Sequence, residues 1–158
     1  GDGVSYGRSP GGGKTWRQEM LEEVGDSIDL SRVHFLGQLS YADYLEVLRV
    51  STVHVYLTYP FILSWSLLEA MSAGCAIVAS STGPVTEVID DGVNGRLCGF
   101  FDAAGLADRI EELLDDRSLR ERLGVAARET IIERYDFDTK IFPQYRALLT
   151  GDLERSEA

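Results

Sequence analysis

The sequence predicts an α/β fold: a parallel sheet with helices on both faces, in a Rossmann-like arrangement. Short apolar segments rich in β-branched residues alternate with amphipathic helical segments along most of the chain, and this alternation is typical of βαβ units. The chain has 158 residues, of which 44% are hydrophobic and 26% are charged. It is therefore long enough for one globular domain with a substantial core, which we expect over residues 1–150.

Turn signals and hydrophobic periodicity set the order of the predicted elements. Residues 1–15 contain seven glycines and prolines, so they are expected to form a flexible loop. The tail over 151–158 is polar and is expected to fray. Between them we expect strands over 33–36, 53–57, 76–79 and 96–98, and helices over 16–24, 41–50, 64–74, 84–89, 106–131 and 138–149.

Three predicted loops follow the carboxyl ends of strands, at residues 37–40, 58–64 and 80–84. The carboxyl ends of parallel strands meet at one edge of a sheet, and ligands of such sheets bind outside that edge. We therefore expect the three loops to converge on one binding site.

The segment from Thr52 to Gly74 contains one acidic residue, Glu69, in apolar surroundings. The loop over 58–64 leads into a helix N-terminus, whose free amides and dipole favour a phosphate or carboxylate. Ser64 and Ser66 add hydroxyl donors. Glu69 could accept hydrogen bonds from two vicinal hydroxyls, as a ribose offers. The alternative is a capping box, Ser66-x-x-Glu69, in which Glu69 bonds only to a backbone amide. The pattern alone leaves both interpretations open.

Weaker candidates lie in the other two loops. The turn around Gly83 could hold an anion or a sugar, although an ordinary capped helix is the simpler interpretation. Gln38 could present its backbone to a planar base, or form a plain turn. His34 and His54 lie in predicted strands and are expected to be core residues rather than catalysts.

Two further patterns favour structural roles. Aromatic residues cluster around the central loop and are expected mainly to pack, although Trp65, at a helix start, could line a pocket; the others are Tyr56, Tyr59 and Phe61. The segment GGGKT at 11–15 is similar to the end of a phosphate-binding P-loop. The first glycine of that motif would fall on Arg8 and no strand precedes it, so a solvated loop is preferred.

Composition excludes several functions. The net charge of −11 argues against nucleic acid or anionic lipid as a general surface partner. Neither a signal peptide nor a transmembrane run is recognisable, which favours a soluble cytosolic protein. Cys75 and Cys98 fit no zinc or redox motif and are expected to be buried free thiols. The two histidines lack the companions that a metal site or a catalytic triad requires, so no metal ligand is predicted.

A set of motifs follows in a specific order between residues 30 and 150. They are Val33-x-Phe35-Leu36-Gly37, Leu67-Leu68-Glu69-Ala70-Met71-x-Ala73-Gly74, Gly83-Pro84-x-x-Glu87-Val88-Ile89, Asp91-Gly92-x-Asn94-Gly95 and Glu133-Arg134-Tyr135-Asp136. In this order the chain resembles the C-terminal, donor-binding domain of family-4 retaining glycosyltransferases, which have the GT-B fold. The resemblance implies that the first strands of this domain and an N-terminal acceptor domain lie outside this chain.

The resemblance also implies roles for residues. Glu69 matches the second carboxylate of the family's Glu-x7-Glu motif, which holds the donor ribose, whereas the position of the first carboxylate is Phe61. No catalytic residue is assigned. The other residues implied to lie beside the donor are Leu63, Ser64, Trp65, Ser66 and Gly83, with Gln38 and Leu39 near the base.

The implied function is transfer of a hexosyl-type sugar from a nucleoside diphosphate sugar to a saccharide, lipid or other acceptor, with retention at the anomeric carbon. We expect a role in polysaccharide biosynthesis, no cofactor, and a cytoplasmic location that leaves open a peripheral place at the inner membrane face for the full-length protein. The chain alone is expected to be inactive. Two alternatives stay open: a non-catalytic GT-B-like binding or adaptor module, which Phe61 favours, and, less favoured, a nucleotide-sugar epimerase.

Overall fold

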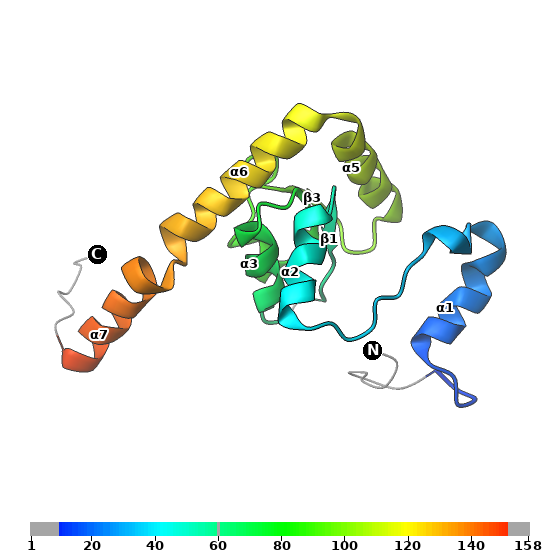
Figure 1. The fold of residues 1–158 in the computed structure, drawn as a ribbon, viewed down its shortest axis with the longest axis horizontal. Helices are drawn as coiled ribbons and strands as arrows, with labels where there is room; N and C mark the ends of the chain where they lie inside the picture. Colours follow the sequence, from blue (N-terminus) through cyan, green and yellow to red (C-terminus); the bar gives the residue numbers. More distant parts are fainter. Residues whose placement is uncertain (1–9, 60, 152–158) are drawn as a thin grey trace. The chain divides into compact units, whose positions relative to one another are not determined.

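A three-stranded parallel sheet lies in the second of two units into which the chain divides. The computed structural model describes residues 10–59 and 61–151, and the units, residues 1–44 and 45–158, are described separately. The strands are β1 (His54–Tyr56), β2 (Ile77–Ser80) and β3 (Arg96–Cys98), in that order and all parallel (Figure 1). The predicted α/β class with parallel strands is confirmed.

The first unit contains one capped helix followed by short turns. Helix α1 (Trp16–Val24) begins at Thr15, whose side chain accepts the Gln18 amide at 3.2 Å while the Gln18 side chain accepts the Thr15 amide at 2.8 Å. The 3₁₀ turns η1 (Gly25–Ser27) and η2 (Leu30–Arg32) follow. Helix α2 (Tyr41–Val50) begins in this unit and continues into the next. Both α-helices have their predicted bounds.

The predicted strand over 33–36 is wrong. These residues are exposed, and in the described part of the chain no strand pairs with them. A strand depends on the hydrogen bonds of a neighbour, so an apolar segment without one stays irregular. His34 is consequently exposed, and its predicted place in the core is wrong as well. Most of the predicted loop over 1–15, and the tail after Gly151, lie outside the described residues.

Helices surround the sheet of the second unit. All four residues of β2 are buried, as expected for a parallel strand covered on both faces. One core cluster joins Val78 of β2 and Cys98 of β3 to Leu113 and Leu123. The helices are α3 (Trp65–Ser72), α4 (Gly83–Thr86), α5 (Ala103–Asp115), α6 (Arg117–Arg134), the π-helical turn η3 (Phe137–Ile141) and α7 (Phe142–Thr150).

Some predicted details change. The last helical region begins at Asp136, not Asp138, because the Asp136 carboxylate accepts the Thr139 amide at 2.9 Å. The helical region expected over 106–131 is divided at Asp116, which caps α6, and Leu114 at the end of α5 is 51% exposed. Both cysteines are buried free thiols, as predicted.

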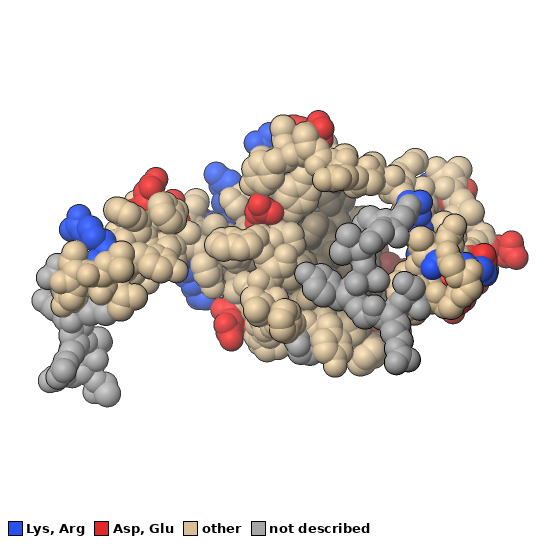
Figure 2. Space-filling model, turned by 90° about the horizontal axis from the view of Figure 1, so that it is seen from below, with Lys and Arg blue, Asp and Glu red and all other residues tan. Residues whose placement is uncertain are grey.

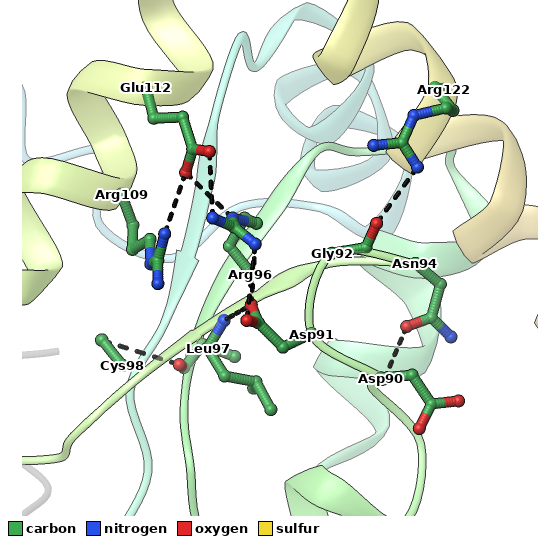
Figure 3. Close-up of polar contacts among 11 residues, drawn as sticks. Asp90, Asp91, Gly92, Asn94, Arg96, Leu97, Cys98, Arg109, Glu112 and Arg122 are labelled. Atoms are coloured by element: carbon green, nitrogen blue, oxygen red, sulfur yellow. Dashed lines mark hydrogen bonds and ion pairs between the residues drawn. The ribbon is translucent and has the colours of Figure 1, made fainter.

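Polar side chains connect the turn over 90–95 to the sheet and to α5 (Figure 3). Asn94 is 2% exposed and accepts the Asp90 amide at 2.8 Å. Arg96 on β3 forms two hydrogen bonds of 2.9 Å to Glu112 on α5. The third strand is thereby tied to both its preceding turn and its following helix.

Helix α6 runs beside α3 (Figure 1), and one glycine of α6 lies against the end of α3. A Cβ atom added at Gly124 of α6 would lie 2.3 Å from the carbonyl oxygen of Gly74. Gly74 follows the end of α3 with a φ of 77°, a conformation that glycine adopts readily. Arg128 of α6 also donates to the Ser72 carbonyl at the same end.

Replacing Gly124 by alanine tests this contact. In an unconstrained helix this change stabilises by about 1 kcal/mol, but here the new methyl group would overlap the Gly74 carbonyl. Overpacking of this kind costs about 1–3 kcal/mol, so we expect Gly124→Ala to lower the free energy of unfolding by about 1–2 kcal/mol in urea titrations. Gly83→Ala is the control, since a Cβ there meets no atom within 4 Å. Equal stability of the two variants would contradict the close approach.

Candidate functional site

Two hydroxyl groups at the carboxyl edge of the sheet hold the loop over 58–64. Ser80, the last residue of β2 and fully buried, accepts the Thr58 amide and donates to the Thr58 carbonyl, both at 3.2 Å. Tyr56, the last residue of β1, is 8% exposed, and its hydroxyl accepts the Ser64 amide at 3.2 Å. Both ends of the loop are therefore attached to the strand ends, as a binding loop at this edge requires.

The loop ends at the N-terminus of α3. Ser64 is the capping residue, and its side chain accepts the Ser66 amide at 3.3 Å. The two serine hydroxyls lie 2.9 Å apart, and no acidic residue occupies the first turn of α3. The two hydroxyls and the helix dipole together make this end suitable for an anionic group.

The position of the cap removes one of the two interpretations of Glu69. With Ser64 as the cap, Ser66 is already inside α3, so the predicted capping box between Ser66 and Glu69 does not form. The half-buried Glu69 carboxylate has no hydrogen bond or ion pair to any residue within 10–59 and 61–151. Contact between Glu69 and a ligand stays a prediction, and the capping box is no longer an alternative to it.

Glu69 faces a cavity of about 790 Å³ between α3 and the C-terminal helices. Glu69 is its only charged lining residue, and most of the others are apolar or aromatic. A carboxylate in such surroundings favours a ligand that offers hydroxyl donors beside apolar surface. Trp65, which the sequence suggested could line a pocket, is one of the residues that line this cavity. The lining residues are Trp65, Leu68, Glu69, Ser72, Ile131, Tyr135, Phe137, Ile141, Gln144, Tyr145 and Leu148.

Of the aromatic cluster in the described residues, Tyr56 alone is buried in the core. Phe61 is 75% exposed and Trp65 is 80% exposed, because the loop leaves the core where β1 ends. Tyr59 is also exposed, and its ring meets Phe100 edge-on with centroids 6.0 Å apart. Phe61 therefore presents an apolar surface at the position where the family resemblance implies a carboxylate.

The other predicted donor-binding residues lie in separate places. Leu63 is half-buried in the central loop. Gly83 is exposed at the start of α4, after β2, where the Ser81 amide donates to the Cys98 carbonyl at 2.7 Å. Gln38 and Leu39 belong to the first unit. The structure thus brings Ser64, Trp65, Ser66 and Glu69 together on α3, with Phe61 and Leu63 in the preceding loop and Gly83 after the neighbouring strand.

Sequence reasoning missed three kinds of contributor to this site. A serine at the end of an apolar strand was a usable signal for Ser80. Tyr135 lies in a recognised motif but was not assigned to the cavity wall, and the hydroxyl of Tyr56 gave no signal at all. Among the described residues, no group of three or more potential ligands could hold a metal ion.

The sheet, its loops and the α3 site define the class of protein: this is a glycosyltransferase domain of the GT-B fold. The chain belongs to the family described as glycosyl transferases group 1, whose sequence profile matches residues 12–130. The family resemblance drawn from the motifs is confirmed.

Named relatives support the assignment. The chain is 34% identical over 117 residues to N-acetyl-alpha-D-glucosaminyl L-malate synthase of Bacillus anthracis, covering 74% of this chain and 30% of that protein. It is 33% identical over 146 residues to phosphatidyl-myo-inositol mannosyltransferase of Mycobacterium leprae, covering 88% and 37%. Among solved structures it resembles Anabaena HepE in complex with UDP, with a TM-score of 0.79 and 25% identity, covering 86% and 37%. The chain thus spans about a third of the length of these proteins.

On the face drawn in Figure 2, basic and acidic side chains are scattered over a largely uncharged surface. In the described parts of the chain, every helix is too short or too polar to cross a membrane.

His54 makes stability depend on pH. Burial on β1 lowers the pKa of its imidazole below the ordinary value of about 6.5. The folded state then binds a proton at His54 less readily than the unfolded state does. The contribution of neutral His54 to the free energy of unfolding is therefore complete above the ordinary pKa of about 6.5 and is lost as the pH falls below it. We expect His54→Gln to reduce the loss of unfolding free energy between pH 8 and pH 5.5 in urea titrations. An identical pH dependence in the variant and the wild type would contradict this role.

Proposed function

We propose that this chain is the donor-binding part of an enzyme that transfers a hexosyl-type sugar from a nucleoside diphosphate sugar, with retention at the anomeric carbon. The main support is Glu69, a half-buried carboxylate without a partner in the described chain, beside a cavity and five residues beyond the N-terminal cap of α3. Family membership supplies the reaction type. HepE, which was solved with UDP, supports a nucleotide at this edge.

The proposed binding mode follows the order of groups along the donor. The Glu69 carboxylate accepts hydrogen bonds from the two ribose hydroxyls, which charge assistance strengthens. The diphosphate lies over the N-terminus of α3, where Ser64 and Ser66 contribute their hydroxyls and the helix dipole favours negative charge. The base contacts the backbone of Gln38 and Leu39, while the sugar lies toward the loop with Phe61 and Leu63 and toward Gly83.

The chemistry asked of this chain is positional and electrostatic. The bond between the anomeric carbon and the diphosphate breaks, and negative charge grows on the leaving phosphate. The dipole of α3 and the hydroxyls held at its N-terminus stabilise this charge without reorganising. The proposal uses no protein nucleophile and no protein-bound metal.

The acceptor and the remaining partner complete the proposal. One relative is named for mannosyl transfer to phosphatidyl-myo-inositol, which supports a lipid acceptor, and a saccharide is the other candidate. We propose that a further domain of the same protein holds the acceptor opposite this edge. The enzyme acts in the cytoplasm and, if its acceptor is a lipid, at the inner face of the membrane. Its product serves polysaccharide synthesis.

A second candidate is a non-catalytic GT-B-like binding module. Phe61 favours it, since it places an exposed ring where a carboxylate was expected. Such a module would keep the fold without needing a nucleotide, so nucleotide binding separates the two functions.

Calorimetry with UDP, GDP and ADP tests the proposed donor site. We expect one nucleotide to bind and Glu69→Ala to weaken it by about 10- to 100-fold, because hydrogen bonds to a charged group contribute about 1.5–3 kcal/mol. Glu129→Ala, which removes an exposed carboxylate from α6, is the matched control and should bind normally. Equal affinities in the two variants would remove Glu69 from the site, and no binding by the wild type would favour the adaptor.

The proposed second domain is tested by activity. We expect the 158-residue chain alone to release no nucleoside diphosphate from a donor in the presence of acceptors, and a longer polypeptide that includes an acceptor domain to do so. Sugar transfer at an ordinary enzymatic rate by the chain alone would contradict the proposal.

A further inference from the structure

We infer that Tyr56 is a positioning residue for the diphosphate, because its hydroxyl fixes the anion-binding end of α3. This inference rests on the proposed function. It concerns a residue that lies below the site, on β1, and that the donor itself need not touch.

The central loop has little else to hold it. Among the described residues, no backbone-to-backbone hydrogen bond attaches 58–63 to the rest of the chain. Phe61 and Ile62 are 75% and 72% exposed, so apolar burial contributes little at the loop tip. A segment with few buried contacts opens easily unless it is tethered.

The two tethers act at opposite ends of this loop. Ser80 holds the entry at Thr58 through two hydrogen bonds of 3.2 Å. Tyr56 holds the exit, since its hydroxyl accepts the amide of Ser64, the capping residue of α3, at 3.2 Å. Only the second tether bears directly on the helix end.

The tyrosine contact is continuous with the hydroxyls at the helix end. The amide of Ser64 points at Tyr56, while the Ser64 hydroxyl accepts the Ser66 amide at 3.3 Å and lies 2.9 Å from the Ser66 hydroxyl. A shift of Ser64 would therefore move both serine hydroxyls and the first amides of α3 together. The Tyr56 ring is 8% exposed, which restricts its own movement.

In this arrangement, different residues bind the diphosphate and the nucleoside of the ligand. Ser64 and Ser66 serve the diphosphate, whereas Glu69 lies further along α3 and is not bonded to the tethered residues. Loss of the Tyr56 hydroxyl should therefore weaken recognition of the diphosphate much more than recognition of the nucleoside. A general loosening of the fold would weaken both equally.

The test compares Tyr56→Phe with Tyr59→Phe. Both variants delete one phenolic oxygen, but Tyr59 lies in the loop and its ring packs on Phe100 without bonding Ser64. For Tyr56→Phe we expect faster hydrogen exchange at the Ser64 and Ser66 amides, and an affinity for the nucleoside diphosphate lowered about three- to tenfold, the effect of one hydrogen bond. Affinity for the matching nucleoside should change less than about twofold, and Tyr59→Phe should behave as wild type.

Three outcomes would overturn the inference: unchanged exchange at Ser64 in Tyr56→Phe, an equal loss for nucleoside and diphosphate, or the same loss in Tyr59→Phe. Failure of the proposed function gives a different result. In that case wild type binds none of UDP, GDP and ADP, and the inference fails with it because there is no diphosphate to position.

Discussion

The close approach of α6 to the end of α3 is the constraint on which the site depends. Gly124 lets two backbones meet where a side chain would overlap the Gly74 carbonyl oxygen, and Gly74 supplies the φ of 77° at that point. Arg128, one turn further along α6 than Gly124, donates to Ser72, which lies before Gly74, so the helices run in opposite directions. Ile131 and Tyr135, at the C-terminal end of α6, consequently lie beside the part of α3 that contains Glu69. The position of the cavity therefore depends on the glycine contact at the C-terminal end of α3.

Arginine side chains on α6 reinforce this arrangement. Arg128 donates to the Ser72 carbonyl at the end of α3, Arg120 donates to the Leu113 and Leu114 carbonyls at the end of α5, and Arg122 donates to the Gly92 carbonyl at 3.1 Å (Figure 3). Carbonyls at helix ends lack partners in their own helix, and a cation there also offsets the helix dipole. In a chain of net charge −11, Arg122 and Arg128 are exposed, yet each donates to a backbone carbonyl of another segment.

Features encoded locally could be predicted from the sequence, and features that depend on a distant partner could not. The glycine after α3 and the bounds of α2 follow from neighbouring residues, and they are correct. The segment over 33–36 has the composition of a strand, but no described strand lies next to it to pair with, so the strand predicted from its composition is wrong. Glu69 was ambiguous because Ser64 and Ser66 are both good caps, and only the backbone decides between them. The bond from Tyr56 to Ser64 spans a loop whose path the sequence does not encode.

The cavity beside Glu69 has two walls of different origin. The α3 wall is fixed by the glycine contact and by the sheet beneath it. The opposite wall comes largely from residues after Tyr135, where a π-helical turn leads into α7, and these residues take no part in the sheet. Substitutions between Phe137 and Leu148 can therefore reshape the cavity while the folding core stays intact. Such a division lets the shape of the cavity change without a matching loss of stability.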